Sequence, residues 1–409
     1  MKKKDLYNFV LIENGSVTTP VGFLAAATKC SIKSPNRFDF GIIFSEKPAI
    51  TTATFTKNKL KAAPVIVCAE LLQKNKKFNG ILVNSGNANA ATGKKGVDDC
   101  KHILSQVEKS MNVKTSSLLM ASTGVIGQYL PVNKMIKAIK KFQTNLSKED
   151  LSFSKAILTT DKFTKRIALK IYKDKDQSYS IGATSKGAGM ICPDMATMLA
   201  FITTDAKADH SFLQKTLKKA VSKTFNKITV DGDMSTNDSV FLMANGASNC
   251  DIKTEEDMII FKSALIYICK YLALQIVKDG EGATKVVEIQ IKGASSKKDA
   301  KKAAFKISNS LLFKTMLFGE DPNWGRIMAS IGAANINMDE KLVDIYIDDL
   351  LLVQNGFLTS KDNELIAKKI MGEKTFKITV NLNLSRYNFN TYTADIGHKY
   401  IDINAGYRS

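Results

Sequence analysis

The order of apolar and polar residues predicts a strand-rich start to the chain. Between residues 15 and 67, short apolar runs alternate with turn residues and prolines, a pattern typical of strands joined by tight connections. A compact apolar run at Ile81–Val83 predicts a further buried strand. Before it we expect four strands, at Val17–Val21, Phe38–Ile43, Ile50–Phe55 and Ala62–Val67.

Helical spacing appears in four later stretches. Apolar residues recur every three or four positions at 96–107 and again at 135–142, where lysines take the opposite face. Ser211 is expected to cap a third helix. Thr254 is expected to open a longer one, with Asp257 three positions on in a relative of the capping box.

After residue 285 the pattern changes to alternating strands and amphipathic helices. We expect strands at Val286–Ile291, Leu342–Ile347 and Phe376–Leu384, and helices at Lys301–Phe318 and Asn363–Met371. The pattern predicts a large α/β domain over residues 1–284. A smaller C-terminal domain of the α+β type is expected over residues 285–409.

The stretch 186–206 joins two halves of different character. Up to Asp194 it contains Gly187, Gly189 and Pro193, which predict an irregular loop. From Met195 onward it is apolar, as in a buried strand or a short buried helix. Thr197 stands at the junction, where a hydroxyl can be held against a rigid core beside a pocket. Thr197 is therefore either a candidate nucleophile or a β-forming residue that enters a core strand.

Composition limits the class of protein. The chain has 409 residues, of which 44% are hydrophobic and 24% charged, as in an ordinary globular protein. No secretory signal precedes Glu13, and lysines interrupt the apolar stretch 258–277, so we expect no membrane span. The six cysteines form no C-x-x-C pair and there are three histidines, so we expect no metal site and a reducing cytoplasm.

The formal net charge of +20 raises the question of nucleic-acid binding. The basic residues are mostly lysines in short pairs along the whole chain, without aromatic residues between them. Phosphate and base recognition favours arginine instead. The pattern is that of a lysine-rich solvated surface, and we expect no nucleic-acid partner.

Short motifs along the chain carry a resemblance to a known family. They are Asn-Ser-Gly-Asn-Ala-Asn at 84–89, Ser-Thr-Gly-Val-Ile-Gly at 122–127, the stretch Lys-Gly-Ala-Gly-Met-Ile-Cys-Pro-Asp-Met-Ala-Thr-Met-Leu-Ala-Phe at 186–201, Val-Asp-Gly-Asp-Met-Ser-Thr-Asn-Asp at 230–238, Gly-Glu-Gly-Ala-Thr-Lys at 280–285, Gly-Glu-Asp-Pro-Asn-Trp-Gly-Arg at 319–326 and Asn-Ala-Gly-Tyr-Arg-Ser at 404–409. In this order and spacing the chain resembles the bifunctional ornithine acetyltransferase (glutamate N-acetyltransferase) family of arginine biosynthesis.

The resemblance implies a reaction and an N-terminal-nucleophile-like layered fold. Members move acetyl from N-acetylornithine to glutamate through an acetyl-threonine intermediate. They cut themselves between the residues that match Ala196 and Thr197, which gives an alpha chain 1–196 and a beta chain 197–409. Two copies of each are expected to assemble as a heterotetramer. No cofactor is expected, and acetyl-CoA as a further co-substrate is left open.

The resemblance also assigns roles to individual residues. Thr123 and Gly124 match the oxyanion hole, although a plain tight turn would show the same Thr-Gly step. The chain's C-terminal tail is expected to return to the active site. The residues that match substrate contacts are Thr160, Lys186, Thr197, Glu281, Asn404 and Ser409.

The chain departs from the family pattern at two positions, and two other functional classes fit parts of its sequence. Cys192 and Asp194 replace residues common in the family, and a carboxylate three residues before the cut could alter the rate of self-cleavage. An N-terminal-nucleophile aminopeptidase of related fold would pass the acyl group to water, and its nucleophile is normally serine. A basic binding protein without catalysis would keep an uncut chain.

Overall fold

The computed structural model describes residues 9–33, 35–192 and 198–406. Ala196, Thr197 and Ser409 therefore lie outside the described residues. The chain divides into two compact units. The N-terminal unit comprises residues 1–187, 194–226 and 234–273, and the C-terminal unit comprises residues 188–193, 227–233 and 274–409.

Among the described residues, the N-terminal unit is built on a nine-stranded sheet of order β1-β6-β7-β8-β10-β3-β4-β5, with β2 paired to β3. Most neighbours are antiparallel, whereas β8 with β10 and β4 with β5 are parallel. The strands are β1 (Phe9–Ile12), β2 (Phe23–Thr28), β3 (Phe40–Phe55), β4 (Lys77–Asn84), β5 (Leu118–Ser122), β6 (Lys165–Tyr172), β7 (Ser178–Lys186), β8 (Leu199–Thr204) and β10 (Ser239–Ala244).

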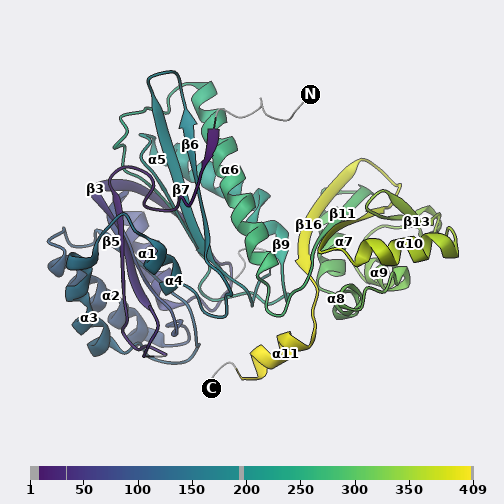
Figure 1. The fold of residues 1–409 in the computed structure, drawn as a ribbon, viewed down its shortest axis with the longest axis horizontal. Helices are drawn as coiled ribbons and strands as arrows, with labels where there is room; N and C mark the ends of the chain where they lie inside the picture. The colour runs from purple at the N-terminus through teal and green to yellow at the C-terminus, as the bar shows by residue number, and fades with distance from the viewer. Residues whose placement is uncertain (1–8, 34, 193–197, 407–409) are drawn as a thin grey trace. The chain divides into compact units, whose positions relative to one another are not determined.

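Helices pack on both faces of this sheet. They are α1 (Ala63–Lys74), α2 (Gly93–Ser110), α3 (Val132–Asn145), α4 (Leu151–Ala156), α5 (His210–Lys223), the 3-10 helix η1 (Phe225–Lys227) and α6 (Glu255–Lys278). Side chains of β4 alternate between two apolar clusters: Ile81 and Val83 pack with Phe153 of α4, whereas Leu82 packs with Ile103 of α2. Successive side chains of a strand point to opposite faces of the sheet, so β4 is buried on both faces. The sheet is the middle layer, with helices on either side (Figure 1).

Several predicted elements of the N-terminal unit need correction. The stretch Val17–Val21 forms turns between β1 and β2 and is not a strand, because Pro20 and Gly22 favour turns. The stretches Phe38–Ile43 and Ile50–Phe55, expected as two strands, fall largely within the single strand β3.

The stretch Ala62–Val67 lies at the start of helix α1 and is not a strand, because Pro64 fits the first turn of a helix. The apolar stretch after residue 197 is the strand β8. Asp209, rather than Ser211, is the N-cap residue of α5.

Helix α6 is long and apolar. Within the described part of the chain it is the one helix whose length and composition would allow it to cross a membrane, with a mean hydropathy of 1.6 over 18 residues, of which 44% are buried. Phe261 of α6 is fully buried against Tyr179 and Phe212. A buried helix of a globular core meets the same criteria, so this helix is weak support for a membrane span. The predicted cap is confirmed, because Thr254 and Asp257 exchange hydrogen bonds at 3.1 Å.

The C-terminal unit contains, among the described residues, a seven-stranded sheet of order β14-β13-β12-β15-β11-β16-β9. The strands are β9 (Ile228–Thr229), β11 (Val286–Ala294), β12 (Asp344–Ile347), β13 (Leu350–Gln354), β14 (Phe357–Leu358), β15 (Thr375–Asn381) and β16 (Tyr387–Ala394). The helices are α7 (Lys297–Ser308), α8 (Leu311–Phe318), α9 (Trp324–Gly332), the 3-10 helix η2 (Glu340–Leu342), α10 (Lys361–Met371) and α11 (His398–Ala405).

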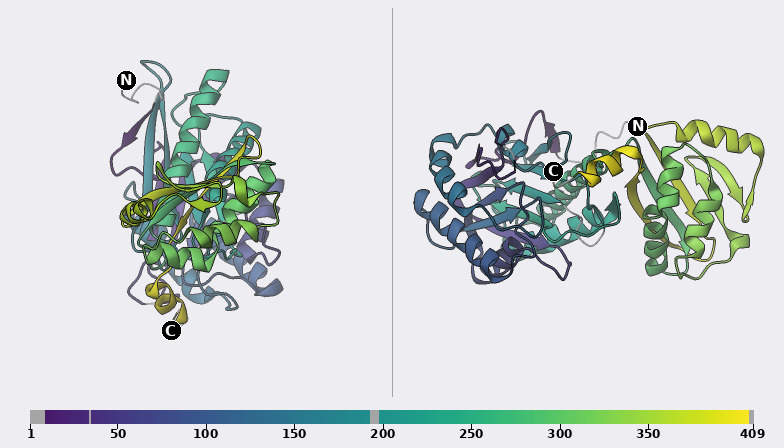
Figure 2. Two further views of the ribbon diagram at one scale, coloured as in Figure 1. Left: turned by 90° about the vertical axis from the view of Figure 1, so that its right-hand side faces the viewer. Right: turned by 90° about the horizontal axis from the view of Figure 1, so that it is seen from below.

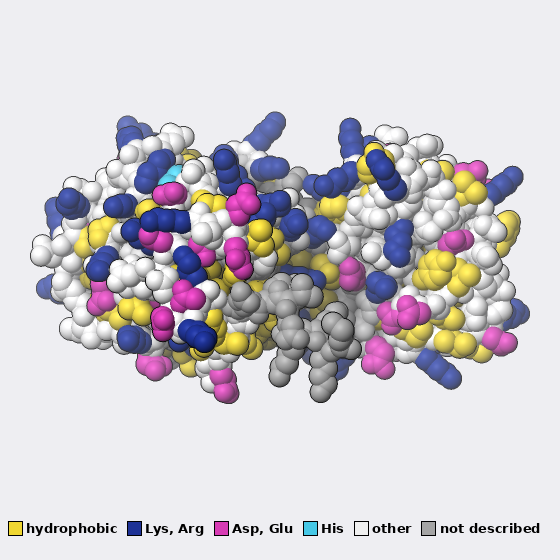
Figure 3. Space-filling view, turned by 90° about the horizontal axis from the view of Figure 1, so that it is seen from above, with side chains coloured by type: hydrophobic (Ala, Val, Ile, Leu, Met, Phe, Trp, Pro, Cys, Tyr) yellow, Lys and Arg dark blue, Asp and Glu magenta, His cyan; other side chains and the backbone are white. Residues whose placement is uncertain are grey.

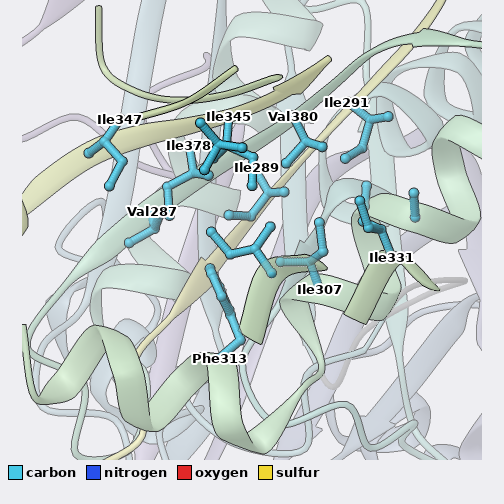
Figure 4. Packing of buried hydrophobic residues seen from close by; sticks show 14 of the residues in the cluster. Val287, Ile289, Ile291, Ile307, Phe313, Ile331, Ile345, Ile347, Ile378 and Val380 are labelled. Atoms are coloured by element: carbon cyan, nitrogen blue, oxygen red, sulfur yellow. The ribbon is translucent and has the colours of Figure 1, made fainter. Parts of the chain in front are cut away.

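One apolar cluster joins this sheet to its helices. Val287, Ile289 and Ile291 of β11 point toward Ile307 of α7 and Phe313 of α8, and all five are fully buried (Figure 4). Residues of α9 and α10 complete the same cluster, so these helices cover one face of the sheet, as the further views show (Figure 2). The predicted fold class, a layered α/β protein, is confirmed.

The expected strands of the C-terminal unit are present, and one expected helix is divided. The stretch Lys301–Phe318 forms parts of two helices, α7 and α8. The break falls at Ser310, whose side chain accepts a hydrogen bond from the backbone N–H of Phe313 and so caps α8. Apolar periodicity continues through a cap of this kind, which is why it predicted one helix.

Charged side chains are mixed on the surface. On the face shown in Figure 3, Lys and Arg side chains are spread over both units with Asp and Glu between them. The net charge of +20 is therefore dispersed on this face rather than gathered in one continuous basic region. This is the distribution expected of a solvated lysine-rich surface.

Candidate active site

Lys186 is the centre of a buried polar cluster in the N-terminal unit. It is the last residue of β7, pairs with Leu199 at the start of β8, and is 3% exposed. Its Nζ donates hydrogen bonds to the hydroxyl oxygens of Thr159 at 2.7 Å and Thr123 at 3.3 Å. A buried ammonium group needs such partners, and its donors here face two hydroxyls. The structure therefore brings together Lys186 and Thr123, two candidate site residues from separate stretches of the sequence.

Asp161 balances the charge of this cluster. Its carboxylate is fully buried, lies 2.8 Å from Lys165 Nζ and 3.9 Å from Lys186 Nζ, and accepts the backbone N–H of Gly187 at 2.6 Å. Burial raises the pKa of Asp161, but the charges of Lys186 and Lys165 and the hydrogen bonds from Lys165 and the Thr159 N–H together hold it well below its ordinary value. The aspartate therefore stays ionised and orients Lys186.

Thr123 and Gly124 form a turn directly after β5. Gly124 has a φ of +135°, and a Cβ there would lie 2.3 Å from the carbonyl carbon of Gly86. Glycine is therefore required at this position. The turn is braced by Asn84, whose carbonyl accepts the Thr123 N–H at 3.0 Å and whose side chain accepts the Ser122 hydroxyl at 2.6 Å. The end of β4 and the loop after it thus fix the positions of the Thr123 hydroxyl and the Gly124 backbone.

The segment 188–192, which precedes the predicted cleavage site, belongs to the C-terminal unit. The Asp231 carboxylate accepts the backbone N–H groups of Met190 at 2.6 Å and Ile191 at 2.8 Å. Met190 has a φ of +56°, a backbone conformation that residues other than glycine rarely adopt. The hydrogen bonds to Asp231 stabilise it. Ile191 is also bonded through its carbonyl to the Val230 N–H at 2.9 Å.

Glu281 lies against this segment. It is 5% exposed, its backbone N–H donates to Ala188 at 2.9 Å, and its carboxylate accepts the side-chain amide of Asn404 at 2.7 Å. A Cβ on Gly189 would lie 2.4 Å from the carboxyl carbon of Glu281. The predicted Glu281 and Asn404 are therefore in contact, and Gly189 leaves the room that the carboxylate occupies.

Two buried groups support the loop that carries Glu281. The Asp395 carboxylate accepts the Thr284 N–H and hydroxyl and the Lys285 N–H, at 2.7 to 2.8 Å. Lys314 donates to the Thr393 hydroxyl at 2.6 Å and to the Ala394 carbonyl at 2.8 Å. Burial lowers the pKa of Lys314 to about 7, although the charges of Asp231 and Asp395 raise it.

The site residues predicted from the sequence fall into two groups. Lys186, Thr123 and Gly124 lie in the N-terminal unit, and Glu281 and Asn404 lie in the C-terminal unit. Thr160 lies next to Thr159 and is half-buried. Thr159, Asp161 and Asp395 were not among the residues predicted from the sequence, although the Thr-Thr-Asp run at 159–161 contained the signal for the first two.

Cysteine and metal chemistry are not evident in the described part of the chain. Cys192 is half-buried, and the other five cysteines are buried free thiols. Burial raises the pKa of Cys68 to about 12, which disfavours its thiolate form at neutral pH. No group of three or more His, Cys, Asp or Glu among the described residues is arranged to hold a metal ion.

Comparison with known proteins gives matches over almost the whole chain. A family model described as the ArgJ family matches residues 24–409. The glutamate N-acetyltransferase of Methanocaldococcus jannaschii is 43% identical over 406 residues, which cover 96% of this chain and 98% of the relative. The arginine biosynthesis bifunctional protein ArgJ of Geobacter sulfurreducens is 41% identical over 391 residues, covering 95% and 99%.

Among solved structures, an arginine biosynthesis bifunctional protein argJ from Bacillus halodurans is 34% identical, with a TM-score of 0.44. The match covers 46% of this chain and 98% of that one. An ornithine acetyltransferase from Mycobacterium tuberculosis, complexed with ornithine, is 29% identical with a TM-score of 0.42, covering 45% of this chain and 98% of that one.

Proposed function

The chain belongs to the ArgJ family, and from that premise we propose that it transfers acetyl from N-acetyl-L-ornithine to L-glutamate. The products are ornithine and N-acetylglutamate. The observation that carries the proposal is the buried contact of Lys186 with the hydroxyl of Thr123, because it places a fixed cation beside a candidate oxyanion donor. A relative that is 43% identical and matched over 98% of its length is named glutamate N-acetyltransferase, and one that is 41% identical is named an arginine biosynthesis bifunctional protein.

The proposed nucleophile is Thr197. Self-cleavage after Ala196 makes Thr197 the first residue of the beta chain, and its free α-amino group has an ordinary pKa of about 7.7 to 8.0. This amine takes the proton of the Thr197 hydroxyl as the oxygen attacks the acetyl carbonyl. The C–N bond then breaks, the proton passes to the leaving amine, and ornithine departs from acetyl-Thr197.

The second half of the reaction reverses these steps with glutamate. The neutral amine of glutamate attacks acetyl-Thr197, its proton passes to the α-amino group of Thr197, and the ester bond breaks as the hydroxyl regains a proton. Both amino acids carry an α-carboxylate and an amine, so one pocket can receive them in turn. Transfer rather than hydrolysis requires that glutamate, and not water, reaches the acetyl group.

The Thr123–Gly124 turn is the proposed oxyanion hole. Lys186 donates to the Thr123 oxygen, which polarises the hydroxyl and makes it a stronger donor toward a developing negative charge. Because Gly124 has no side chain, its turn can pack directly against the backbone of Gly86 and Asn87, and its N–H is the second proposed donor. Fixed donors at this point act mainly on the transition state, in which the carbonyl oxygen carries charge.

Substrate orientation is assigned to the remaining residues. The Glu281 carboxylate, held by Asn404 and buried against Gly189, is suited to bind an ammonium group of the substrate. Lys186 and Thr160 in the N-terminal unit and Ser409 at the C-terminus are proposed as further contacts. We also propose a cytoplasmic enzyme that assembles as two copies of each cleaved chain and does not bind nucleic acid.

Denaturing gels and mass spectrometry test the proposal. Purified wild-type protein should contain two chains, 1–196 and 197–409, and Thr197→Ala should remain a single chain without activity. Incubation with N-acetylornithine should leave a mass increase of one acetyl group on the beta chain. An active wild-type protein that stays uncut, or acetyl-ornithine hydrolysis with no N-acetylglutamate formed, would contradict the assignment; the second result would favour the aminopeptidase class.

A further inference from the structure

Two adjacent residues before β10, Asn237 and Asp238, contact both strand ends that carry the proposed chemistry. Asn237 is 6% exposed and Asp238 is fully buried. Neither residue belongs to the site derived above. Both lie in the N-terminal unit, as do their hydrogen-bonding partners Met198, Ser122 and Ala88.

Asp238 fixes the start of the strand that follows the proposed nucleophile. Its Oδ1 accepts the backbone N–H of Met198 at 3.0 Å. The Met198 carbonyl accepts the backbone N–H of Ser239 at 3.1 Å, and the parallel pairing of β8 and β10 then begins at Leu199. Met198 is therefore held by both of its backbone polar groups.

Asn237 fixes the strand end before the proposed oxyanion hole. Its side-chain Nδ2 donates to the carbonyl oxygens of Ser122 at 2.8 Å and Ala88 at 2.6 Å. Ser122 is the last residue of β5 and directly precedes Thr123. One side chain thus ties the oxyanion turn to the same segment that holds Met198.

The environment of Asp238 favours a neutral hydrogen-bonding group. Its Oδ2 is buried and has no hydrogen-bond partner among the described residues. Burial raises the pKa of Asp238 well above its ordinary value, although the Met198 N–H, the side chains of Ser235 and Thr56 and the charge of Lys186 lower it in part. An ionised carboxylate without a charged partner is energetically unfavourable when it is buried. The neutral form is therefore favoured, and its Oδ1 still accepts the hydrogen bond from Met198.

We propose that Asn237 and Asp238 are positioning residues for the acetyl transfer. Asp238 holds the backbone at Met198, the residue that directly follows the proposed nucleophile. Asn237 holds the carbonyl of Ser122 and thereby the donors that follow it. The inference rests on the proposed function, in which Thr197 is the nucleophile and Thr123 and Gly124 receive the oxyanion.

The experiment compares Asp238→Ala and Asp238→Asn with a matched control, Asp205→Ala. Asp205 is also a buried carboxylate, 2% exposed, and it accepts the backbone N–H groups of Ser180 at 2.7 Å and Val21 at 2.9 Å. It directly follows β8, whereas Asp238 binds the residue before β8. For each variant we measure the unfolding temperature, the fraction of cleaved chain, and kcat and KM with N-acetylornithine and glutamate.

Both alanine variants should unfold at a lower temperature, but only Asp238→Ala should cleave slowly. Its kcat should fall about a hundredfold with KM little changed, since a small misplacement of a reacting group has an effect of that order. Asp238→Asn should retain nearly wild-type kcat, because the amide oxygen still accepts the Met198 N–H. If Asp238→Ala matches Asp205→Ala, or if Asp238→Asn is as impaired as Asp238→Ala, the positioning role is refuted.

Two further measurements keep the test decisive. If Asp238→Ala does not fold, Asn237→Asp replaces the donors toward two carbonyls by acceptors at constant size, and kcat should fall with KM little changed; an unchanged kcat refutes the role of Asn237. Hydrogen exchange of the Met198 amide should accelerate in Asp238→Ala relative to Asp205→Ala. A wild-type protein without acetyl transfer would refute the proposed function instead, whatever the variants show.

Discussion

The carboxylate of Glu281 occupies the space that a side chain on Gly189 would need. A Cβ at Gly189 would lie 2.4 Å from the carboxyl carbon and 2.5 Å from each carboxylate oxygen. Gly189 precedes the proposed cleavage site by seven residues, and its neighbour Ala188 accepts the Glu281 N–H. The chain before the cut therefore forms one wall of the proposed ammonium site.

Gly189→Ala should displace the Glu281 carboxylate and raise KM for both amino acids about tenfold or more, the loss expected when a charge-assisted hydrogen bond of about 1.5–3 kcal/mol is broken. Steady-state kinetics measure this change. Gly332→Ala is the control, because a Cβ there meets no atom within 4 Å. A Gly189→Ala enzyme with wild-type KM would remove Glu281 from substrate binding.

Thr123→Ala should lower kcat by about a hundredfold or more, the usual effect of removing one oxyanion donor. KM should change little, because the donor acts on the transition state. Thr204→Ala is the control: its hydroxyl is also buried and donates to the Ser180 carbonyl at 2.7 Å. A change in KM alone would make Thr123 a substrate-binding residue.

Asp161→Asn should destabilise the protein by about 3–5 kcal/mol, because it leaves the buried ammonium groups of Lys165 and Lys186 without their carboxylate. The folded-state pKa of Asp161 is lowered, so its contribution is present above the unfolded pKa of about 3.9 and is lost as pH falls further. Urea unfolding at pH 7 measures the effect. Asp251→Asn, which removes the carboxylate partner of the exposed Lys207 and Lys253, should change stability little. An equal effect of both variants would argue against the buried cluster.

Lys314 should make stability depend on pH between about 7 and 10. Its folded-state pKa is lowered to about 7, whereas an unfolded lysine titrates near pH 10.4, so the unfolded chain binds more protons in this window and stability rises with pH. Relative to Lys314→Met, the wild-type free energy of unfolding should rise by up to about 1.4 kcal/mol per pH unit. Lys306→Met, on the exposed side of α7, corrects for the lost charge. If the difference in the free energy of unfolding between wild type and Lys314→Met stays constant over this pH range, Lys314 is not neutral in the folded protein.

Initial rates should follow a ping-pong pattern, because ornithine must leave before glutamate enters a shared pocket. Parallel double-reciprocal lines are expected, and intersecting lines would deny Thr197 a covalent role. The same assay tests acetyl-CoA, whose thioester is more reactive than an amide. We expect slow N-acetylglutamate synthesis above the Thr197→Ala background, and a rate equal to that background would define a monofunctional enzyme.

Local pattern determined much of the fold. Alternating and apolar runs predicted β4, β11 and β15, whereas the run that forms β8 was equally compatible with a short buried helix. The cap formed by Thr254 and Asp257 was visible as two residues three positions apart. Prediction from local pattern was wrong where two local signals conflict. Apolar residues after Ala62 predicted a strand, but Pro64 lies in the first turn of a helix, where its missing N–H costs nothing.

Sequence by itself also named the candidate site residues, because a motif identifies residues without needing their partners in space. It marked Lys186, Thr123, Glu281 and Asn404 in four separate stretches. Only the tertiary structure showed which carboxylates hold them. Asp161 reaches Gly187 across 26 positions, and Asp395 reaches Thr284 across 111. Such contacts depend on strand order and burial, which local periodicity does not encode, so a buried aspartate that orients a neighbour looks in sequence like any other turn residue.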